Sequence, residues 1–180
     1  MTLNTPQHLL FEFVRQQHGS QLRKYTGEPY HTHLFGVAEI ASQYAARSVE
    51  VALCHDLYED TDCDFQSLFK KMQSIGYDRE FSYDVCRHVT ELTDKFTKQA
   101  FPYLKRSVRK ECEAQRLGTI SYLAQTVKYA DLIHNTASIV EYDQNFAKIY
   151  LKEKARILEL MRKGNPQLLE LCEKTLAEAM

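Results

Sequence analysis

The spacing of the apolar residues constrains the fold most strongly, because along most of the chain they recur every three or four residues. This period places apolar side chains on one face of an α-helix. The 180 residues include only six glycines and four prolines, and no alternating apolar pattern bounded by turn residues indicates a β-hairpin. The sequence therefore predicts an all-α fold, a helical bundle.

The predicted helices follow from this period and from residues typical of helix ends. They span residues 5–18, 30–47, 48–58, 65–75, 78–92, 102–116, 119–140, 144–163 and 166–179. Thr5 followed by Pro6 is a typical helix start, and Gly19 is a typical stop. Residues 59–64 are predicted to form an acidic turn, and residues 93–101 a loop.

The length and charge of the chain exclude several classes of function. A chain of 180 residues predicts one domain, residues 1–180, with a sizeable core. A formal net charge of −1 provides no general attraction to nucleic acid or to an anionic membrane, so phosphate binding must be local. No apolar run approaches the ~18 residues of a membrane span. We therefore expect neither nucleic acid nor membrane as a partner.

The cysteines and the first residues predict a cytoplasmic protein. The five cysteines are odd in number, scattered, and without zinc-finger spacing, which is typical of packed free thiols in a reducing compartment. They are Cys54, Cys63, Cys86, Cys112 and Cys172. The first six residues are polar, and no signal-peptide pattern follows them.

Two histidines and two aspartates form a candidate metal site. They are His33, the adjacent pair His55-Asp56, and Asp131. Mixed imidazole and carboxylate ligands suit manganese, iron, cobalt, nickel or zinc. Four protein ligands on an octahedral ion leave two positions for water and a substrate oxygen. Because the four residues lie in three predicted helices, a bundle core is the kind of structure that brings them together.

A second acidic pair, Glu59-Asp60, follows the His-Asp pair directly. Carboxylates beside a metal favour metal-assisted hydrolysis of a phosphate ester or anhydride. The residues alone also allow a simpler interpretation. A His-Asp pair occurs by chance in many proteins, His33 is then a surface histidine, and Asp131 is a solvated helix residue.

Three strings favour the metal interpretation, because together they resemble the successive motifs of one family. They are RKYTGEPYHTH (Arg23–His33), ALCHDLYEDTD (Ala52–Asp62) and VKYADLIHN (Val127–Asn135). They resemble HD-domain hydrolases, and more narrowly the hydrolase domain of Rel/SpoT proteins and the stand-alone small alarmone hydrolases. The ordered match extends over about residues 23–140.

The resemblance implies an HD-domain helical bundle and a role for each matched residue. It implies His33, His55, Asp56 and Asp131 as manganese ligands. His33 takes the ligand place rather than His31, because it lies three residues after Tyr30 in the PYxxH string. Glu59 and Asp60 are implied to position or deprotonate the attacking water. Arg23 and Lys24 are implied to lie near the nucleotide, and Asn135 to contact the substrate.

The reaction implied is hydrolysis of the 3′-pyrophosphate of guanosine tetra- or pentaphosphate, which yields GDP or GTP and pyrophosphate. Two departures from the family bear on the exact nucleotide. Leu34 stands where proline is usual, and Thr136, Ala137 and Ser138 follow Asn135 where a basic residue is common. Lys95, Lys98, Lys105, Arg106 and Arg109 are either further phosphate contacts or a solvated face.

Two alternatives to this reaction remain open. The first is an HD phosphohydrolase for another nucleotide: a nucleoside monophosphate, a cyclic nucleotide or NADPH. The second is a non-catalytic nucleotide sensor that keeps the metal, although a sensor has no need of Glu59 and Asp60. Apolar positions on the last two helices are consistent with a homodimer, and core packing explains them equally well.

Overall fold

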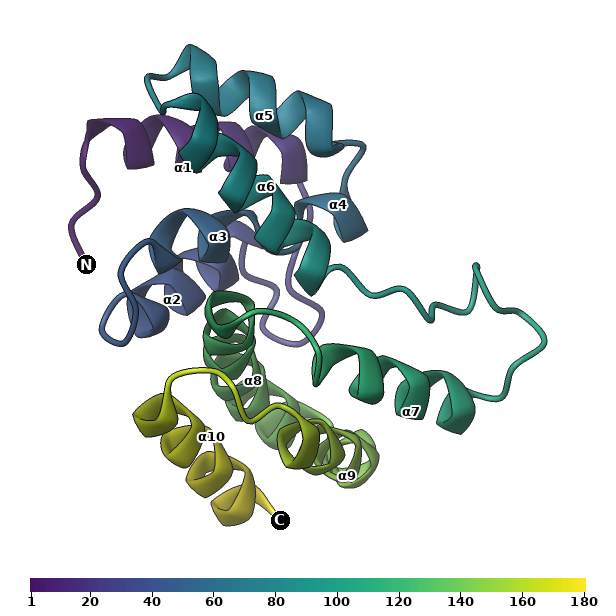
Figure 1. The fold of residues 1–180 in the computed structure, drawn as a ribbon. Coiled ribbons are helices and arrows are strands. Elements are labelled where there is room, and N and C mark those ends of the chain that lie inside the picture. Colours follow the sequence, from purple (N-terminus) through teal and green to yellow (C-terminus); the bar gives the residue numbers. More distant parts are fainter. The chain divides into compact units, whose positions relative to one another are not determined.

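The computed structural model describes all 180 residues and contains ten α-helices and no strand, which confirms the all-α prediction (Figure 1). The chain divides into two compact units, Met1–Thr93 and Asp94–Met180. The expectation that residues 1–180 act as one domain remains a prediction. No helix combines the length and the apolar character that a membrane crossing requires.

The first unit is built around α3, which packs against α1, α2 and α6. Its six helices are α1 (Thr5–His18), α2 (His31–Ala41), α3 (Ser48–Cys54), α4 (Leu57–Asp60), α5 (Phe65–Ser74) and α6 (Arg79–Leu92). Val51, Ala52 and Leu53 are fully buried, so the apolar run that predicts this helix is explained by neighbours on several sides. The predicted metal-ligand pair His55-Asp56 follows this helix directly.

A short loop between α1 and α2 carries the Arg-Lys pair. An antiparallel bridge joins Leu22 to Pro29, and the Arg23 amide donates to the Glu28 carbonyl oxygen at 2.8 Å. Gly27 turns the chain with φ +71°, a backbone conformation that favours glycine. The loop is thus a backbone-bonded turn that presents two basic side chains.

The second unit has α8 at its centre, packed against α9 and α10, while α7 packs against α9 (Figure 1). Its helices are α7 (Arg106–Leu117), α8 (Tyr122–Tyr142), α9 (Gln144–Leu160) and α10 (Pro166–Ala179). The turn before α10 is fixed on α8, because the buried Gln125 side chain accepts the Lys163 amide at 2.8 Å. Gly164 lies against the Tyr129 ring, where a Cβ would come within 2.4 Å of a ring carbon.

Several helix ends differ from the predicted ones. The second helix ends at Ala41 instead of residue 47, and the third ends at Cys54 instead of residue 58. The predicted acidic turn begins as the helix α4, because the Asp56 carbonyl oxygen accepts the amides of Glu59 and Asp60 at 3.1 and 3.0 Å.

The seventh helix starts at Arg106 instead of Pro102, and the loop before it is correspondingly longer. Buried Glu113 holds that loop, since its carboxylate accepts the amides of Lys95 and Phe96 at 3.0 and 2.9 Å. The Phe96 and Phe101 rings stack with their centroids 5.0 Å apart. These contacts connect residues distant in sequence, so local spacing could not indicate them.

Candidate metal centre

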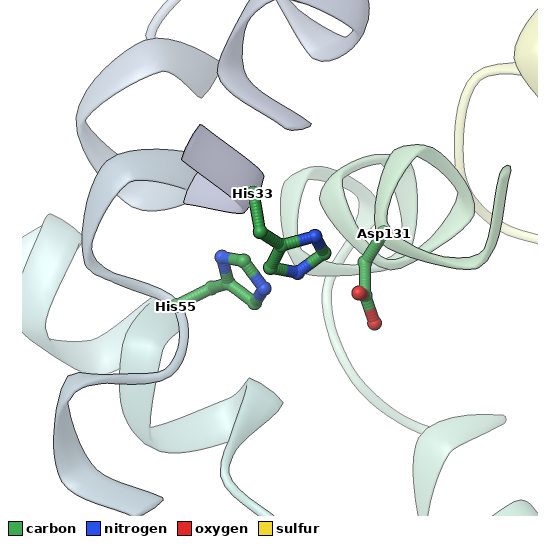
Figure 2. Close-up of side chains that lie close together, drawn as sticks. All are labelled: His33, His55 and Asp131. Atoms are coloured by element: carbon green, nitrogen blue, oxygen red, sulfur yellow. The ribbon is translucent and has the colours of Figure 1, made fainter. Parts of the chain in front are cut away.

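Three of the predicted metal ligands lie together in the first unit. The rings of His33 and His55 are adjacent, with centroids 5.3 Å apart, as Figure 2 shows. The Asp56 carboxylate lies 3.1 Å from His55 Nε2 and 3.7 Å from His33 Nε2. Both histidines are almost fully buried, at 2 % and 1 % exposure. Two imidazoles and a carboxylate so arranged are a donor set that suits a first-row divalent metal.

The orientation of His55 is set by the end of α3. Its Nδ1 lies 2.7 Å from the Ala52 carbonyl oxygen, and a carbonyl can only accept, so we assign the proton to Nδ1. The lone pair then belongs to Nε2, the nitrogen that points toward Asp56. A histidine held in this way is typical of metal ligands, whose other ring nitrogen usually donates to a backbone carbonyl or a carboxylate.

Asp56 is oriented by a residue that the sequence analysis did not single out. The Tyr30 hydroxyl donates to Asp56 Oδ2 at 2.6 Å, and the Tyr30 ring stacks on the His18 ring with centroids 4.9 Å apart. Tyr30 belongs to the PYxxH string that singles out His33, so the same motif contains one predicted ligand and a residue that orients another predicted ligand. The PYxxH string was therefore the sequence signal that could have indicated Tyr30.

The second acidic pair lies on α4, on the exposed side of this cluster. Glu59 and Asp60 are both solvent-exposed, and the Gln21 side chain donates to Asp60 Oδ2 at 3.0 Å. Gln21 in turn contacts His18 Nδ1 through its Oε1 at 2.8 Å. Sequence reasoning missed Gln21, because no pattern within its own segment indicates a partner 39 residues away.

The basic pair on the loop has partners of its own. Arg23 lies 3.6 Å from the Glu28 carboxylate, and its side chain is 11 % exposed. Lys24 Nζ donates to the Tyr25 hydroxyl at 3.1 Å and lies 4.7 Å from the centroid of that ring. A phosphate that binds Arg23 would therefore compete with Glu28, whereas Lys24 is near the surface.

The remaining two predicted site residues lie on α8 in the second unit. Asp131 is 5 % exposed, and the Asn135 amide donates to its Oδ1 at 2.6 Å. Lys128 Nζ lies 2.8 Å from its Oδ2. Because residues three and four apart share a helix face, one face of α8 carries the carboxylate, its hydrogen-bond donor and a cation. Figure 2 labels Asp131 on this helix.

The chain is similar to two curated pyrophosphohydrolases and to one solved structure. It is 31 % identical over 129 residues to guanosine-3′,5′-bis(diphosphate) 3′-pyrophosphohydrolase MESH1 of Drosophila melanogaster. It is 30 % identical over 128 residues to MESH1 of Danio rerio. The solved structure, of a metazoan orthologue of SpoT reported to hydrolyse ppGpp, aligns with a TM-score of 0.78 and 22 % identity over 99 % of this chain and 97 % of that chain. No family model matches the chain.

The chain is thus similar in sequence to two such pyrophosphohydrolases, as the predicted resemblance to alarmone hydrolases leads one to expect. The aligned segments cover 69 % and 68 % of this chain but only 64 % and 63 % of the two MESH1 proteins, just under two thirds of their length. The structural alignment confirms the fold over almost the whole chain.

Proposed function

We propose that this chain, as a relative of those pyrophosphohydrolases, hydrolyses guanosine tetra- or pentaphosphate at the 3′-pyrophosphate. Water is consumed, the bond between the 3′ oxygen and phosphorus breaks, and GDP or GTP and pyrophosphate leave. The observation that carries the proposal is the cluster of His33, His55 and Asp56, with a second acidic pair beside it. The MESH1 relatives carry the name of this activity, which supports the choice of substrate.

We propose Mn²⁺ as the metal, held by His33, His55, Asp56 and Asp131. Two imidazoles and two carboxylates fit manganese and related first-row ions. A bound divalent ion would polarise a phosphate oxygen and lower the pKa of a bound water. The adjacent imidazoles in the first unit, with the lone pair of His55 on Nε2, support this donor set.

Glu59 and Asp60 are proposed to hold the attacking water and accept its proton. Both carboxylates are exposed, so water reaches them, and Gln21 holds Asp60 in one orientation. A general base must lie within hydrogen-bond reach of the proton that it removes, and a carboxylate fixed by a neighbour meets that need better than a free one.

Arg23, Lys24 and Asn135 are proposed to bind the nucleotide. The guanidinium of Arg23 can pair with a phosphate and stack on a flat base, and the ammonium of Lys24 adds a second positive charge on the same loop. Asn135 donates one amide hydrogen to Asp131 Oδ1, so its contact with substrate would use the second amide hydrogen or the amide oxygen.

The test is release of pyrophosphate from guanosine tetraphosphate by the purified protein with added Mn²⁺, beside two variants. Asp56→Asn keeps the shape of the side chain and removes its charge, so we expect turnover to be lost. Asp84→Asn makes the same change on α6, at a side chain that is 40 % exposed, and should leave turnover unchanged. Equal activity in all three proteins would refute the proposed centre.

A substrate panel separates this function from the two alternatives. Turnover of NADPH, a nucleoside monophosphate or a cyclic nucleotide in place of guanosine tetraphosphate would identify a different HD phosphohydrolase. Tight nucleotide binding with no turnover of any of them would identify a sensor. The cytoplasmic location, the homodimer, and the lack of nucleic acid and membrane partners remain predictions from the sequence.

A further inference from the structure

His18, the last residue of α1, contacts two residues that each hold a carboxylate of the candidate site. Its ring stacks on the Tyr30 ring, with centroids 4.9 Å apart and an interplanar angle of 24°. The Tyr30 hydroxyl donates to Asp56 Oδ2 at 2.6 Å. On the other side, His18 Nδ1 lies 2.8 Å from Gln21 Oε1, and Gln21 Nε2 donates to Asp60 Oδ2 at 3.0 Å. One imidazole therefore stands behind both a predicted metal ligand and a predicted water-activating group.

The direction of the second row of hydrogen bonds follows from its partners. A carboxylate only accepts, so the Gln21 amide turns its NH₂ group toward Asp60 and its carbonyl oxygen toward His18. That carbonyl oxygen also only accepts, so the proton of the neutral His18 ring is assigned to Nδ1. His18 therefore donates to Gln21, Gln21 donates to Asp60, and only one orientation of the amide satisfies both ends.

The backbone anchors the same segment. The Gln21 amide donates to the His18 carbonyl oxygen at 3.0 Å, and the Gln21 carbonyl oxygen accepts the Tyr30 amide at 2.9 Å. Helix α1 also packs against α4, the helix that carries Asp60. The Gln21 side chain thus starts from a backbone that is bonded on both sides, next to the helix that it contacts.

Packing alone does not explain an imidazole at this position. His18 is 6 % exposed, and its Nε2 is buried without a hydrogen-bond partner. A buried polar atom left unpaired costs stability. A phenylalanine ring would stack on Tyr30 and bury no such atom. What a phenylalanine would lack is the Nδ1 donor, so the contact with Gln21 is the interaction that offsets the cost.

We propose that His18 is a positioning residue for both carboxylates. Its ring holds Tyr30 against Asp56, and its Nδ1–H group holds the Gln21 amide against Asp60. Residues that orient metal ligands typically contribute about 10–100-fold to metal affinity or activity. The inference rests on the proposed function for the roles of Asp56 and Asp60, whereas the tautomer of His18 is measurable without substrate or metal.

The first test is nitrogen-15 NMR of the His18 ring in the metal-free protein, at a pH where the ring is neutral. The chemical shifts of the two ring nitrogens report which of them carries the proton. We expect the proton on Nδ1, and a changed Nδ1 signal in Gln21→Met, which removes the amide and keeps a side chain of similar length. A neutral ring with its proton on Nε2 would overturn the inference, whatever the substrate proves to be.

Two variants of His18 separate its two contacts. His18→Phe keeps a ring beside Tyr30 and removes the Nδ1 donor. We therefore expect the rate of pyrophosphate release at saturating Mn²⁺ to fall about tenfold, and the manganese affinity to change less. His18→Asn keeps an N–H donor near the position of Nδ1 and removes the ring. We expect the opposite pattern from it: about tenfold weaker manganese binding, measured by calorimetry without substrate, and a smaller change in rate.

The matched control is His88→Phe. His88 is a comparably buried imidazole of the same unit, 8 % exposed, and its ring nitrogens contact Arg87 and Glu91 on its own helix. We expect neither the rate nor the manganese affinity to change more than twofold. An equal fall of both quantities in the two His18 variants, or a similar fall in His88→Phe, would show a merely structural role and overturn the inference.

The outcomes also separate this inference from the proposed function. If the wild-type protein releases no pyrophosphate from guanosine tetraphosphate, the proposed substrate is wrong, and the ring tautomer and the manganese affinities still decide the role of His18. If circular dichroism shows that a His18 variant is unfolded, the NMR comparison of the wild type with Gln21→Met decides it.

Discussion

The two units of the molecule organise their polar side chains in different ways. In the first, His33, His55 and Asp56 are oriented by short contacts within one unit, such as the Tyr30 hydroxyl and the Ala52 carbonyl oxygen. In the second, Asp131 is held by neighbours on its own helix α8, since the Asn135 amide donates to its Oδ1 at 2.6 Å and Lys128 Nζ lies 2.8 Å from its Oδ2. The predicted ligands of the first unit therefore depend on contacts between segments, whereas the predicted ligand of the second depends on the spacing of one helix.

The largest change in rate is expected when a histidine is removed from the first unit. We expect His33→Ala to lower the rate of pyrophosphate release by about 10³-fold, because a lost ligand removes several kcal/mol of transition-state stabilisation. The matched control is His31→Ala, two residues earlier, whose ring contacts Phe11 and which should change the rate less than threefold. A similar loss in both variants would mean that local structure, and not ligation, explains the effect.

A smaller effect is expected from the residue that orients Asp56. Tyr30→Phe removes the hydroxyl that donates to Asp56 at 2.6 Å, and residues that orient metal ligands typically contribute about 10–100-fold to affinity or activity. We expect the manganese affinity and the rate to fall together in that range. Tyr77→Phe removes a comparable bond to Glu50, 3.1 Å long, and should leave both unchanged.

The fold was predictable where one helix depends on its own sequence. The first and last helices begin and end where the sequence predicts, at residues 5–18 and 166–179, because Asn4 and Asn165 cap them and Pro6 and Pro166 occupy the first turn. Helix ends set by distant contacts were not predictable. Pro102 resembles a helix start, but it lies in a turn in which the Leu104 amide donates to the Phe101 carbonyl oxygen at 3.2 Å, and the helix begins only at Arg106.

The candidate site shows the same division. His33, His55 and Asp56 lie in two short strings, so a sequence motif is sufficient to select them as candidates. Gln21 has no local signal, because its contact with Asp60 joins residues 39 positions apart. That contact follows from how the loop and α4 pack, which the sequence did not predict.

The second unit also contains a polar contact with a purely structural role, which gives a contrast to Asp131. Buried Tyr129 donates to the Met161 carbonyl oxygen at 2.5 Å, and burial raises the pKa of its phenol to about 12. Tyr129→Phe leaves that carbonyl unsatisfied, so we expect a loss of about 1–3 kcal/mol in the free energy of unfolding. Thermal unfolding measures this loss, and pyrophosphate release should stay within twofold of the wild-type rate. A large fall in rate would assign Tyr129 to the site.

The smallest expected effect concerns the buried ammonium of Lys154 and the pH dependence of stability. The groups that influence its pKa are Lys110, Lys128, Asp94 and Asp131. Its pKa is about 8 in the fold, against an ordinary 10.5, so between these values the unfolded chain binds more protons and the stability from this group rises with pH. Below about pH 8 the buried charge opposes folding in full.

Lys154→Met removes that opposition. We therefore expect the variant to melt a few degrees above the wild type at pH 7, given ~2–4 °C per kcal/mol for a chain of this size. The difference should shrink as the pH is raised toward 10, and Lys152→Met, which removes the same charge from an exposed position on the same helix, should show no such trend. Scanning calorimetry at the two pH values measures it. If Lys154→Met melts below the wild type at pH 7, the ammonium stabilises the fold.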